Sequence, residues 1–130
     1  MATIFSKIVK GEIPAWKIAE DERFFAFLDI NPLAMGHTLV IPKKETDYIF
    51  DIDDAELADM MVFAKKVAKA IKKVVPCTKM CVTVIGLEVP HAHIHLIPIN
   101  SIYDMDFSKP KLKPEKEVFA KLCMEIASQV

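Results

Sequence analysis

Apolar residues occur along the chain with two different spacings, which predict both strands and helices. Several short apolar runs, rich in β-branched and aromatic residues, have the length and composition of strands. These runs cover residues 16–20, 24–28, 37–41, 80–85 and 89–99. Polar residues between the first two runs predict a hairpin. Pro42 closes the third run, because proline lacks the N–H that a sheet ladder uses.

A much longer stretch has the pattern of an amphipathic helix, with Asp53 as its N-cap and Pro76 as its end. Its apolar positions recur at helical spacing: Leu57, Met60, Met61, Ala64, Val67, Ala68, Ile71, Val74 and Val75. A C-terminal helix is predicted to start near Pro114. It would bury Val118, Phe119, Leu122 and Ile126. A short helical turn is also predicted over residues 7–11.

The order of these elements predicts the fold class. Only Gly86 and residues 87–90 lie between the run at 80–85 and the histidines of the last strand, and so short a link connects antiparallel neighbours far more easily than parallel ones. Strands gathered before and after one long helix favour an α+β domain built on an antiparallel sheet. At 130 residues the chain has the length of one domain with a substantial core, so residues 1–130 are predicted to form a single domain.

Composition and charge exclude several classes of protein. Hydrophobic residues make up 52% of the chain, which is typical of a globular protein and not of a disordered one. The formal net charge of −1 gives no basic footprint for nucleic acid. The three cysteines are too few and too unevenly spaced for a disulfide framework, so we expect reduced thiols. No signal peptide or membrane-spanning run is recognisable, so we expect a cytoplasmic protein that does not contact membranes.

Three of the four histidines lie close together, as His91, His93 and His95 in the last predicted strand. Strand side chains alternate between faces, which puts these imidazoles in one row and residues 92, 94 and 96 on the opposite face. Such a row has three interpretations: ordinary core histidines, a metal site, or nucleophilic catalysis. The first is the weakest, because each buried ring needs a partner for both of its nitrogens.

A metal ion would have to be shared by neighbouring rings, about 6.6 Å apart along a strand, because the outer two are about 13 Å apart. All three rings cannot easily bind one zinc ion at about 2.1 Å. In nucleophilic catalysis, a neutral imidazole held in one tautomer attacks phosphorus or a carbonyl carbon, and a neighbouring imidazole helps to move the proton. His37, at the start of another strand, adds a fourth ring. The residues alone leave acyl transfer and phosphoryl transfer both open.

The segment PHAHIHLI at residues 90–97 resembles the His-φ-His-φ-His-φ-φ signature of the histidine triad (HIT) family. Upstream blocks at residues 4–14, 26–32 and 36–43 are similar to the family in the same register. The chain is most similar to the Hint-like branch of purine nucleotide phosphoramidases. This resemblance implies a HIT-like fold, in which an antiparallel sheet with one long central helix and a C-terminal helix extends across a homodimer.

The resemblance also implies a mechanism and a set of site residues. His93 becomes the nucleophile that attacks the α-phosphorus of a nucleotide and carries the nucleotidyl group. His95 contacts the phosphate and assists proton transfer, His91 supports the orientation of the nucleophile, and His37 completes the hydrogen-bond set. Asp29 binds the ribose hydroxyls. The base lies in an apolar cleft formed by Phe5, Ile8, Ile13, Phe27 and Ile30.

Two departures from the family bear on function. Some relatives carry a zinc site whose cysteines would fall at Thr3 and Ser6, so we expect no structural zinc, and the resemblance implies no cofactor. The loop before the triad, residues 85–90, is several residues shorter than in the Hint-like branch and lacks its Ser or Gln. Glu88 in this loop places negative charge near the phosphate, which disfavours tight binding.

Our leading hypothesis is a nucleotide hydrolase or transferase that acts through a nucleotidyl-His93 intermediate, with a purine nucleotide as its small-molecule partner. The alternative is a purine nucleotide-binding or sensing protein with weak or no turnover, which the short loop and Glu88 favour. The leaving group, the physiological substrate and the role of the segment after Tyr103 stay open.

Overall fold

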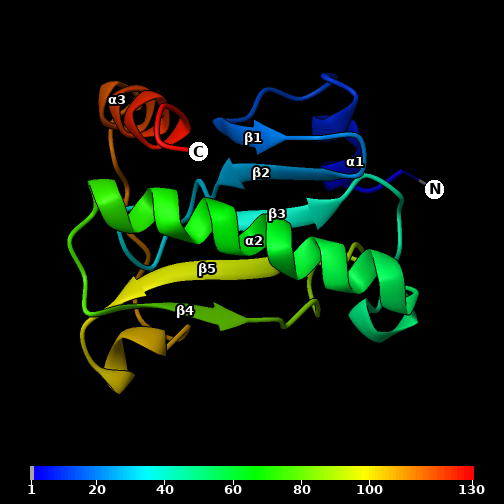
Figure 1. The fold of residues 1–130 in the computed structure, drawn as a ribbon. Helices are drawn as coiled ribbons and strands as arrows, with labels where there is room; N and C mark the ends of the chain where they lie inside the picture. Colours follow the sequence, from blue (N-terminus) through cyan, green and yellow to red (C-terminus); the bar gives the residue numbers. More distant parts are fainter. Residues whose placement is uncertain (1) are drawn as a thin grey trace.

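The computed structural model of the protein describes residues 2–130. Within them the chain forms five strands, three α-helices and two short 3₁₀ helices (Figure 1). In chain order they are α1 (Ile4–Val9), β1 (Lys17–Glu20), β2 (Phe24–Leu28), β3 (Thr38–Pro42), η1 (Ile49–Asp51), α2 (Asp54–Val74), β4 (Lys79–Thr83), β5 (Ile94–Ile99), η2 (Ile102–Met105) and α3 (Lys116–Ala127). None of these helices is both long and apolar enough to span a membrane. The cytoplasmic location stays a prediction.

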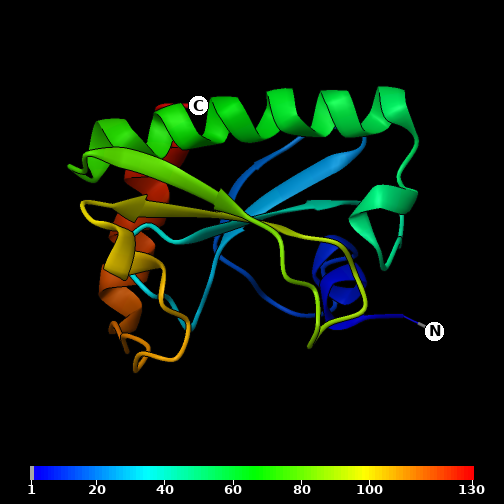
Figure 2. The same ribbon diagram turned by 90° about the horizontal axis from the view of Figure 1, so that it is seen from below.

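The strands form one antiparallel sheet in the order β1-β2-β3-β5-β4. This confirms the predicted antiparallel sheet and the α+β class. The long helix α2 runs along one face of the sheet, and α1 lies on the opposite side, as Figure 2 shows. Nearly all residues of the central strands β2, β3 and β5 are buried, and the α1 side chains pack on β2 and β3.

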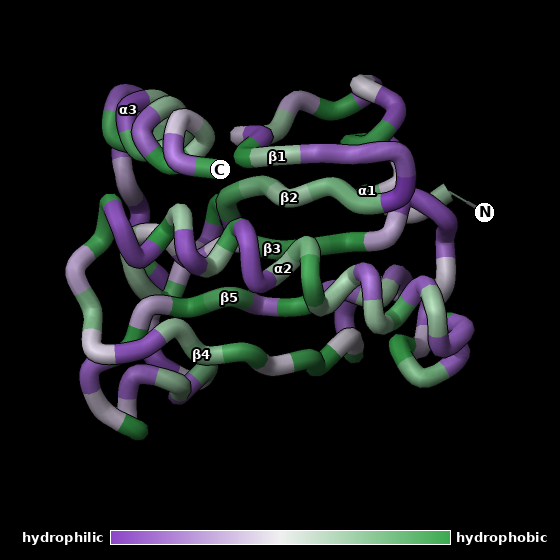
Figure 3. The backbone as a smooth tube through the Cα atoms, viewed as in Figure 1, coloured by the Kyte–Doolittle hydropathy of each residue, from purple (hydrophilic) through white to green (hydrophobic). Residues whose placement is uncertain are grey.

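Alternation along the central strands divides the core into two parts. One set of side chains, which includes Val40 and Ile94, packs with α2. The alternate set, which includes Phe27 and Leu39, packs with Phe5 of α1 on the other face. Figure 3 shows the band of hydrophobic residues that follows these strands. The fold thus offers a second, α1-covered face on which polar chemistry can be placed without disturbing the α2 core.

The helices α2 and α3 form where the sequence predicts them, but one position of α3 and the start of α1 differ from prediction. Asp53 is the N-cap of α2, as predicted. In α3, Phe119 and Ile126 are buried, but Val118 is exposed, contrary to prediction. The reason is that only a narrow side of this helix faces β1 and α2. The first helix begins at Ile4, earlier than the predicted turn.

The last strand is shorter than predicted, because β5 starts only at Ile94. Before it the chain bends: the His91 N–H donates to the Val89 carbonyl, and the Ala92 N–H donates to the Thr46 carbonyl. Neither bond belongs to the sheet ladder. The alternation of faces nevertheless persists, since Ala92 and Ile94 both lie in the α2 core, as expected. The bend places the His91 carbonyl oxygen 2.8 Å from the His93 side chain.

Gly36 fixes the entry of the chain into β3. Its φ of +92° lies in the left-handed region that glycine adopts readily. An added Cβ would also come within 3.1 Å of the Val75 side chain and 3.2 Å of the Ile71 side chain. Glycine at this position therefore lets the turn approach α2 closely and brings His37, the next residue, to its place beside β5.

Candidate active site

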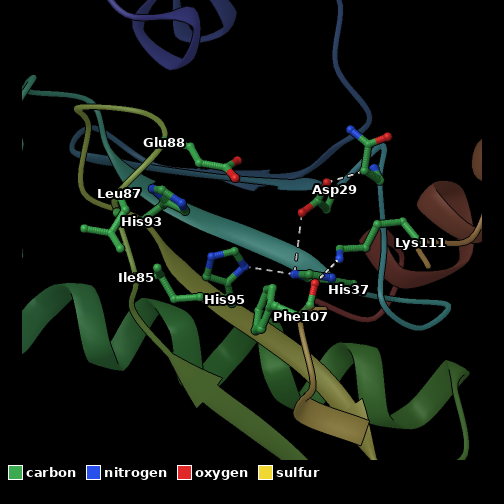
Figure 4. Close-up of a pocket in the computed structure, with 11 residues that line it drawn as sticks. Asp29, His37, Ile85, Leu87, Glu88, His93, His95, Phe107 and Lys111 are labelled. Atoms are coloured by element: carbon green, nitrogen blue, oxygen red, sulfur yellow. Dashed lines mark hydrogen bonds and ion pairs between the residues drawn. The ribbon is translucent and has the colours of Figure 1, made fainter. Parts of the chain in front are cut away.

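A cleft opens on the sheet face that carries the histidines. It consists of two adjoining cavities, of about 340 Å³ and about 280 Å³. His93, His95, Asp29 and Glu88 line both of them. The first cavity extends to His37 and to the segment after η2, as Figure 4 shows, and the second extends to α1. The histidines therefore stand where the two cavities meet.

The His93 ring is held in one orientation by the backbone of the bend before β5. Its Nδ1 atom lies 2.8 Å from the His91 carbonyl oxygen. A carbonyl oxygen only accepts, so Nδ1 carries the proton and Nε2 has a free lone pair. Phe5 packs edge-on against the same ring, with the centroids 5.0 Å apart. The form with the proton on Nδ1 and a free lone pair on Nε2 is the tautomer that a nucleophilic imidazole needs.

His37, directly before β3, and His95, in β5, form a hydrogen-bonded pair. The His37 Nε2 and His95 Nδ1 atoms are 2.9 Å apart. The Leu33 N–H donates to His37 Nδ1 at 3.0 Å, so neutral His37 carries its proton on Nε2 and donates it to His95. Neutral His95 then carries its own proton on Nε2. One backbone N–H thereby sets the proton positions of both rings.

The second nitrogens of His93 and His95 are open to the cleft. Neither Nε2 atom has a hydrogen-bond partner within residues 2–130, and no buried side-chain nitrogen or oxygen in that range lacks one. Both Nε2 atoms therefore reach solvent. The two ring centroids are 4.9 Å apart, so one bound group can contact both rings. The cleft presents a lone pair on one ring beside an N–H donor on the next.

Burial keeps the His37–His95 pair neutral near pH 7. Burial, together with the neighbouring rings, lowers the pKa of His37 to about 3 and the pKa of His95 to about 4. Burial raises the pKa of Asp29, whose Oδ2 atom lies 3.6 Å from His37 Nε2. Because His37 is neutral, this contact is a polar contact and not an ion pair.

These pKa values predict that the folded protein loses stability in mild acid. In the unfolded chain each histidine has a pKa near 6.5. Below that pH the unfolded state therefore binds protons, whereas the folded His37–His95 pair stays unprotonated. Between about pH 7.5 and about pH 5, each ring should lower the free energy of unfolding by about 2 kcal/mol. Urea denaturation at both pH values measures the effect. Replacing both rings, as in His37→Asn with His95→Asn, should flatten the pH dependence, and an unchanged slope would contradict the assignment.

The predicted base cleft is brought together by the fold. The second cavity is lined by Asp29 and by all five apolar residues expected to contact a base: Phe5, Ile8, Ile13, Phe27 and Ile30. Phe5 and Phe27 are buried and pack edge to face, whereas Ile30 is 64% exposed at the rim. Asp29 Oδ1 accepts from the Asn31 N–H at 2.9 Å, which leaves Oδ2 available to a ligand hydroxyl.

The His91 side chain lies outside the cleft. Its ring is fully buried, with Nδ1 2.8 Å from Thr3 Oγ1 and Nε2 2.7 Å from the Pro42 carbonyl oxygen. It lines neither cavity. The three rings share the α1-covered face, since Phe5 contacts both His91 and His93, but the His91 ring is buried under α1 and only the other two reach the cleft. His91 contacts His93 through its backbone carbonyl instead.

Two further cleft residues come from the segment between η2 and α3. Phe107 and Lys111 line the first cavity. The Phe107 ring lies edge-on to His95, 5.2 Å between centroids, and to His37, 6.2 Å between centroids. The Leu112 N–H donates to the Pro32 carbonyl and anchors the segment. No periodicity marks these residues in the sequence, and a lone aromatic among lysines and prolines is the only signal that could have found them.

Phe107 is expected to set the pKa of His95 by covering the pair. The change Phe107→Ala should admit water, reduce the desolvation that disfavours the charged ring, and raise the pKa of His95 from about 4 towards 6.5. An NMR titration of the His95 imidazole measures the shift. Tyr103→Ala, which removes an exposed aromatic ring from η2, is the control and should leave that pKa unchanged. An unchanged value in Phe107→Ala would show that other groups desolvate the pair.

Asp29, His37 and His95 also offer three donor atoms within 4.8 Å of one another, a spacing that a metal ion can use. Here the two imidazole nitrogens already share a hydrogen bond, and the Leu33 N–H occupies the other nitrogen of His37. We interpret the group as a hydrogen-bond set that fixes tautomers.

Comparison with known proteins agrees with this geometry. The HIT domain family model matches residues 10–102. Adenosine 5′-monophosphoramidase HNT1 of Saccharomyces cerevisiae is 40% identical over an alignment that covers 93% of this chain and 83% of the yeast protein. Adenosine 5′-monophosphoramidase hnt1 of Schizosaccharomyces pombe is 37% identical, with 100% and 99% covered. The solved structure of a hypothetical histidine triad nucleotide-binding protein from Sulfolobus tokodaii matches with a TM-score of 0.84 and 32% identity, covering 96% of this chain and 89% of that one. The chain therefore belongs to the HIT family.

Proposed function

We propose that the protein hydrolyses nucleoside 5′-phosphoramidates or related nucleotidyl substrates through a nucleotidyl-His93 intermediate. The observation that carries this proposal is the pair of opposite tautomers in the cleft, with the lone pair of His93 beside the N–H of His95. The adenosine 5′-monophosphoramidase relatives support the substrate class and a purine base. The apolar wall around Phe5 suits the base, and the Asp29 carboxylate suits the ribose hydroxyls.

In the first step, His93 Nε2 attacks the α-phosphorus and the bond from phosphorus to the leaving nitrogen breaks. The departing amine needs one proton, which we assign to His95 Nε2. Neutral His95 already carries this proton and would become an imidazolate on losing it, so the ring must first gain a second proton. The negative charge of the bound phosphate raises the pKa of the ring, and His95 Nδ1 takes up a proton from solvent while the His37 Nε2–H turns to Asp29; this proton returns to solvent when the nucleotide leaves. The Asp29 carboxylate, 3.6 Å from His37 Nε2, stabilises the positive charge that the His37–His95 pair then carries.

In the second step, water attacks the phosphorus of the nucleotidyl-His93 adduct. His95, which has given its Nε2 proton to the amine, now accepts a proton from that water. The bond between phosphorus and His93 Nε2 breaks, and the nucleotide leaves. The His91 carbonyl holds His93 Nδ1–H throughout, so the ring returns to the same tautomer.

The direct test of the activity uses adenosine 5′-phosphoramidate. Purified protein should convert it, with one water, into AMP and ammonia, and both products can be followed together. Release of both in equal amounts supports the proposal. Absence of either product under conditions where the substrate binds would contradict it.

Glu88 supports a second candidate function, nucleotide binding or sensing with weak or no turnover. This carboxylate lines both cavities beside His93, where it repels a phosphate. Calorimetric titration with AMP distinguishes the two functions, because binding without turnover of any phosphoramidate favours the second. The change Glu88→Gln should tighten AMP binding in either case.

We also propose that two copies of the chain pair through β4. The β1 edge of the sheet lies beside α3, where Trp16 stacks on Phe119. At the β4 edge, in contrast, Val82 of the strand and Val62 of α2 are about half exposed and line a common apolar groove. A second copy would cover this groove and extend the sheet. Light scattering should give a dimer for the native chain and a monomer for Val62→Glu, and a monomeric native chain would contradict the proposal.

A further inference from the structure

Four residues connect the first turn of α1 to the nucleophile, and we call them the Thr3 network: Thr3, Ser6, Glu45 and His91. Thr3 is the N-cap of α1, and its Oγ1 accepts from the Ser6 N–H at 3.0 Å. The same oxygen lies 2.8 Å from His91 Nδ1. Thr3, Ser6 and His91 are all buried. Thr3, Ser6 and His91 therefore join segments that are far apart in the sequence within a region closed to solvent, and Glu45 lies at its exposed edge.

The direction of each hydrogen bond follows from groups that can only accept. His91 Nε2 lies 2.7 Å from the Pro42 carbonyl oxygen, so Nε2 carries the proton and Nδ1 has a lone pair. The Thr3 hydroxyl must therefore donate to His91 Nδ1. Both nitrogens of this ring have a hydrogen-bond partner only while the Thr3 hydroxyl is present. Loss of the hydroxyl would leave a buried nitrogen without a partner, which costs free energy.

Glu45, from the loop after β3, fixes Thr3 from the other side. Its Oε1 atom accepts from the Thr3 N–H at 2.7 Å and from Ser6 Oγ at 2.9 Å. These bonds hold the pKa of the Glu45 carboxyl below its usual value. The carboxylate thus binds the first turn of α1 to the end of β3. It does so next to Pro42, whose carbonyl holds the other side of His91.

His91 and α1, which the Thr3 network connects, both contact His93. The His91 carbonyl accepts from His93 Nδ1 at 2.8 Å, and α1 carries Phe5, whose ring contacts both His91 and His93. We propose that Thr3 and Glu45 are positioning residues: acting through His91, they hold the carbonyl that keeps His93 in its Nδ1–H form. The kinetic consequences rest on the proposed function, whereas the tautomer of His93 does not.

The experiment compares Thr3→Val, which removes the hydroxyl, with Thr3→Ser, which keeps it. Nitrogen-15 NMR of the imidazoles should show a single Nδ1–H form of His93 in the native protein and in Thr3→Ser, and a mixture of tautomers in Thr3→Val. With adenosine 5′-phosphoramidate, kcat of Thr3→Val should fall about tenfold to hundredfold while KM changes little. Thr78→Val, which removes a hydroxyl bonded to Asn100 at the start of β4, is the matched control and should behave as native.

A second pair of variants, at Glu45, tests the proposal if Thr3→Val does not fold. Glu45 is exposed, so Glu45→Ala removes the acceptor without opening the core, and Glu45→Gln keeps an oxygen at the same place. Mixed tautomers in Glu45→Ala and recovery in Glu45→Gln support the proposal. A single Nδ1–H signal for His93 in Thr3→Val, or in Glu45→Ala where Thr3→Val is unfolded, would overturn it. A native protein without turnover but with the predicted NMR pattern would refute the proposed function and leave the positioning role standing.

Discussion

Replacing His93 with glycine should abolish turnover of adenosine 5′-phosphoramidate, with a loss in kcat of roughly 10⁴-fold or more. The Nε2 lone pair of His93 is the nucleophile in the proposed mechanism, and its Nδ1 proton is bound to the His91 carbonyl. Neither His37 nor His95 can replace it, because both nitrogens of His37 are hydrogen-bonded and the Nε2 atom of neutral His95 that faces the cleft carries a proton. Steady-state release of AMP measures the loss.

Chemical rescue separates a missing nucleophile from a damaged fold. Imidazole added to His93→Gly can enter the space that the side chain leaves and should restore part of the activity. Binding of AMP, which depends on Asp29 and the apolar cavity, should survive within a few-fold. Turnover by His93→Gly close to the native rate would rule out His93 as the nucleophile.

Replacing His95 with alanine should lower kcat by roughly 10² to 10⁴-fold on a phosphoramidate, because the departing amine loses its proton donor. The size of the defect should depend on the leaving group. Adenosine 5′-phosphofluoridate releases fluoride, which leaves without a proton, so the first step of the same variant should slow far less on it. Because the later attack of water is common to both substrates, the pre-steady-state rates of leaving-group release on the two substrates test the role of His95 as an acid.

His93→Gly is the comparison for this second experiment, because a missing nucleophile should impair both substrates equally. His95→Ala should instead show a ratio of the two rates that differs from native by tenfold or more. An equal loss on both substrates would mean that His95 binds the phosphoryl group and does not deliver the proton.

The periodic parts of the fold could be predicted from the sequence because their physical causes are local. The short apolar runs at residues 24–28 and 37–41, rich in aromatic and β-branched residues, indicate strands whatever lies around them. The helical spacing and the Asp53 N-cap likewise specify α2. The prediction that Val118 is buried is wrong, because the burial of a helix position depends on how much of the helix other elements cover, and only a narrow side of α3 is covered.

The details of the site depend on contacts between distant segments, which no local pattern records. The five apolar residues predicted to contact the base do line one cavity. The direction of the His91 ring, however, is set by Thr3, a residue 88 positions away in the chain. Phe107 lies in a segment without periodicity and reaches His95 only through the path of the chain after β5. Tautomers, too, follow from three-dimensional neighbours such as the Leu33 N–H.

The measurement that tests the central claim most directly is the capture of the nucleotidyl-histidine adduct. Native protein and adenosine 5′-phosphoramidate are mixed, quenched within one turnover and kept alkaline, because bonds between phosphorus and imidazole nitrogen are labile in acid. Peptide mass spectrometry should then find an adenylyl group on His93, formed and lost at rates that account for AMP release. AMP release without any adduct, or an adduct on a different residue, would contradict the mechanism.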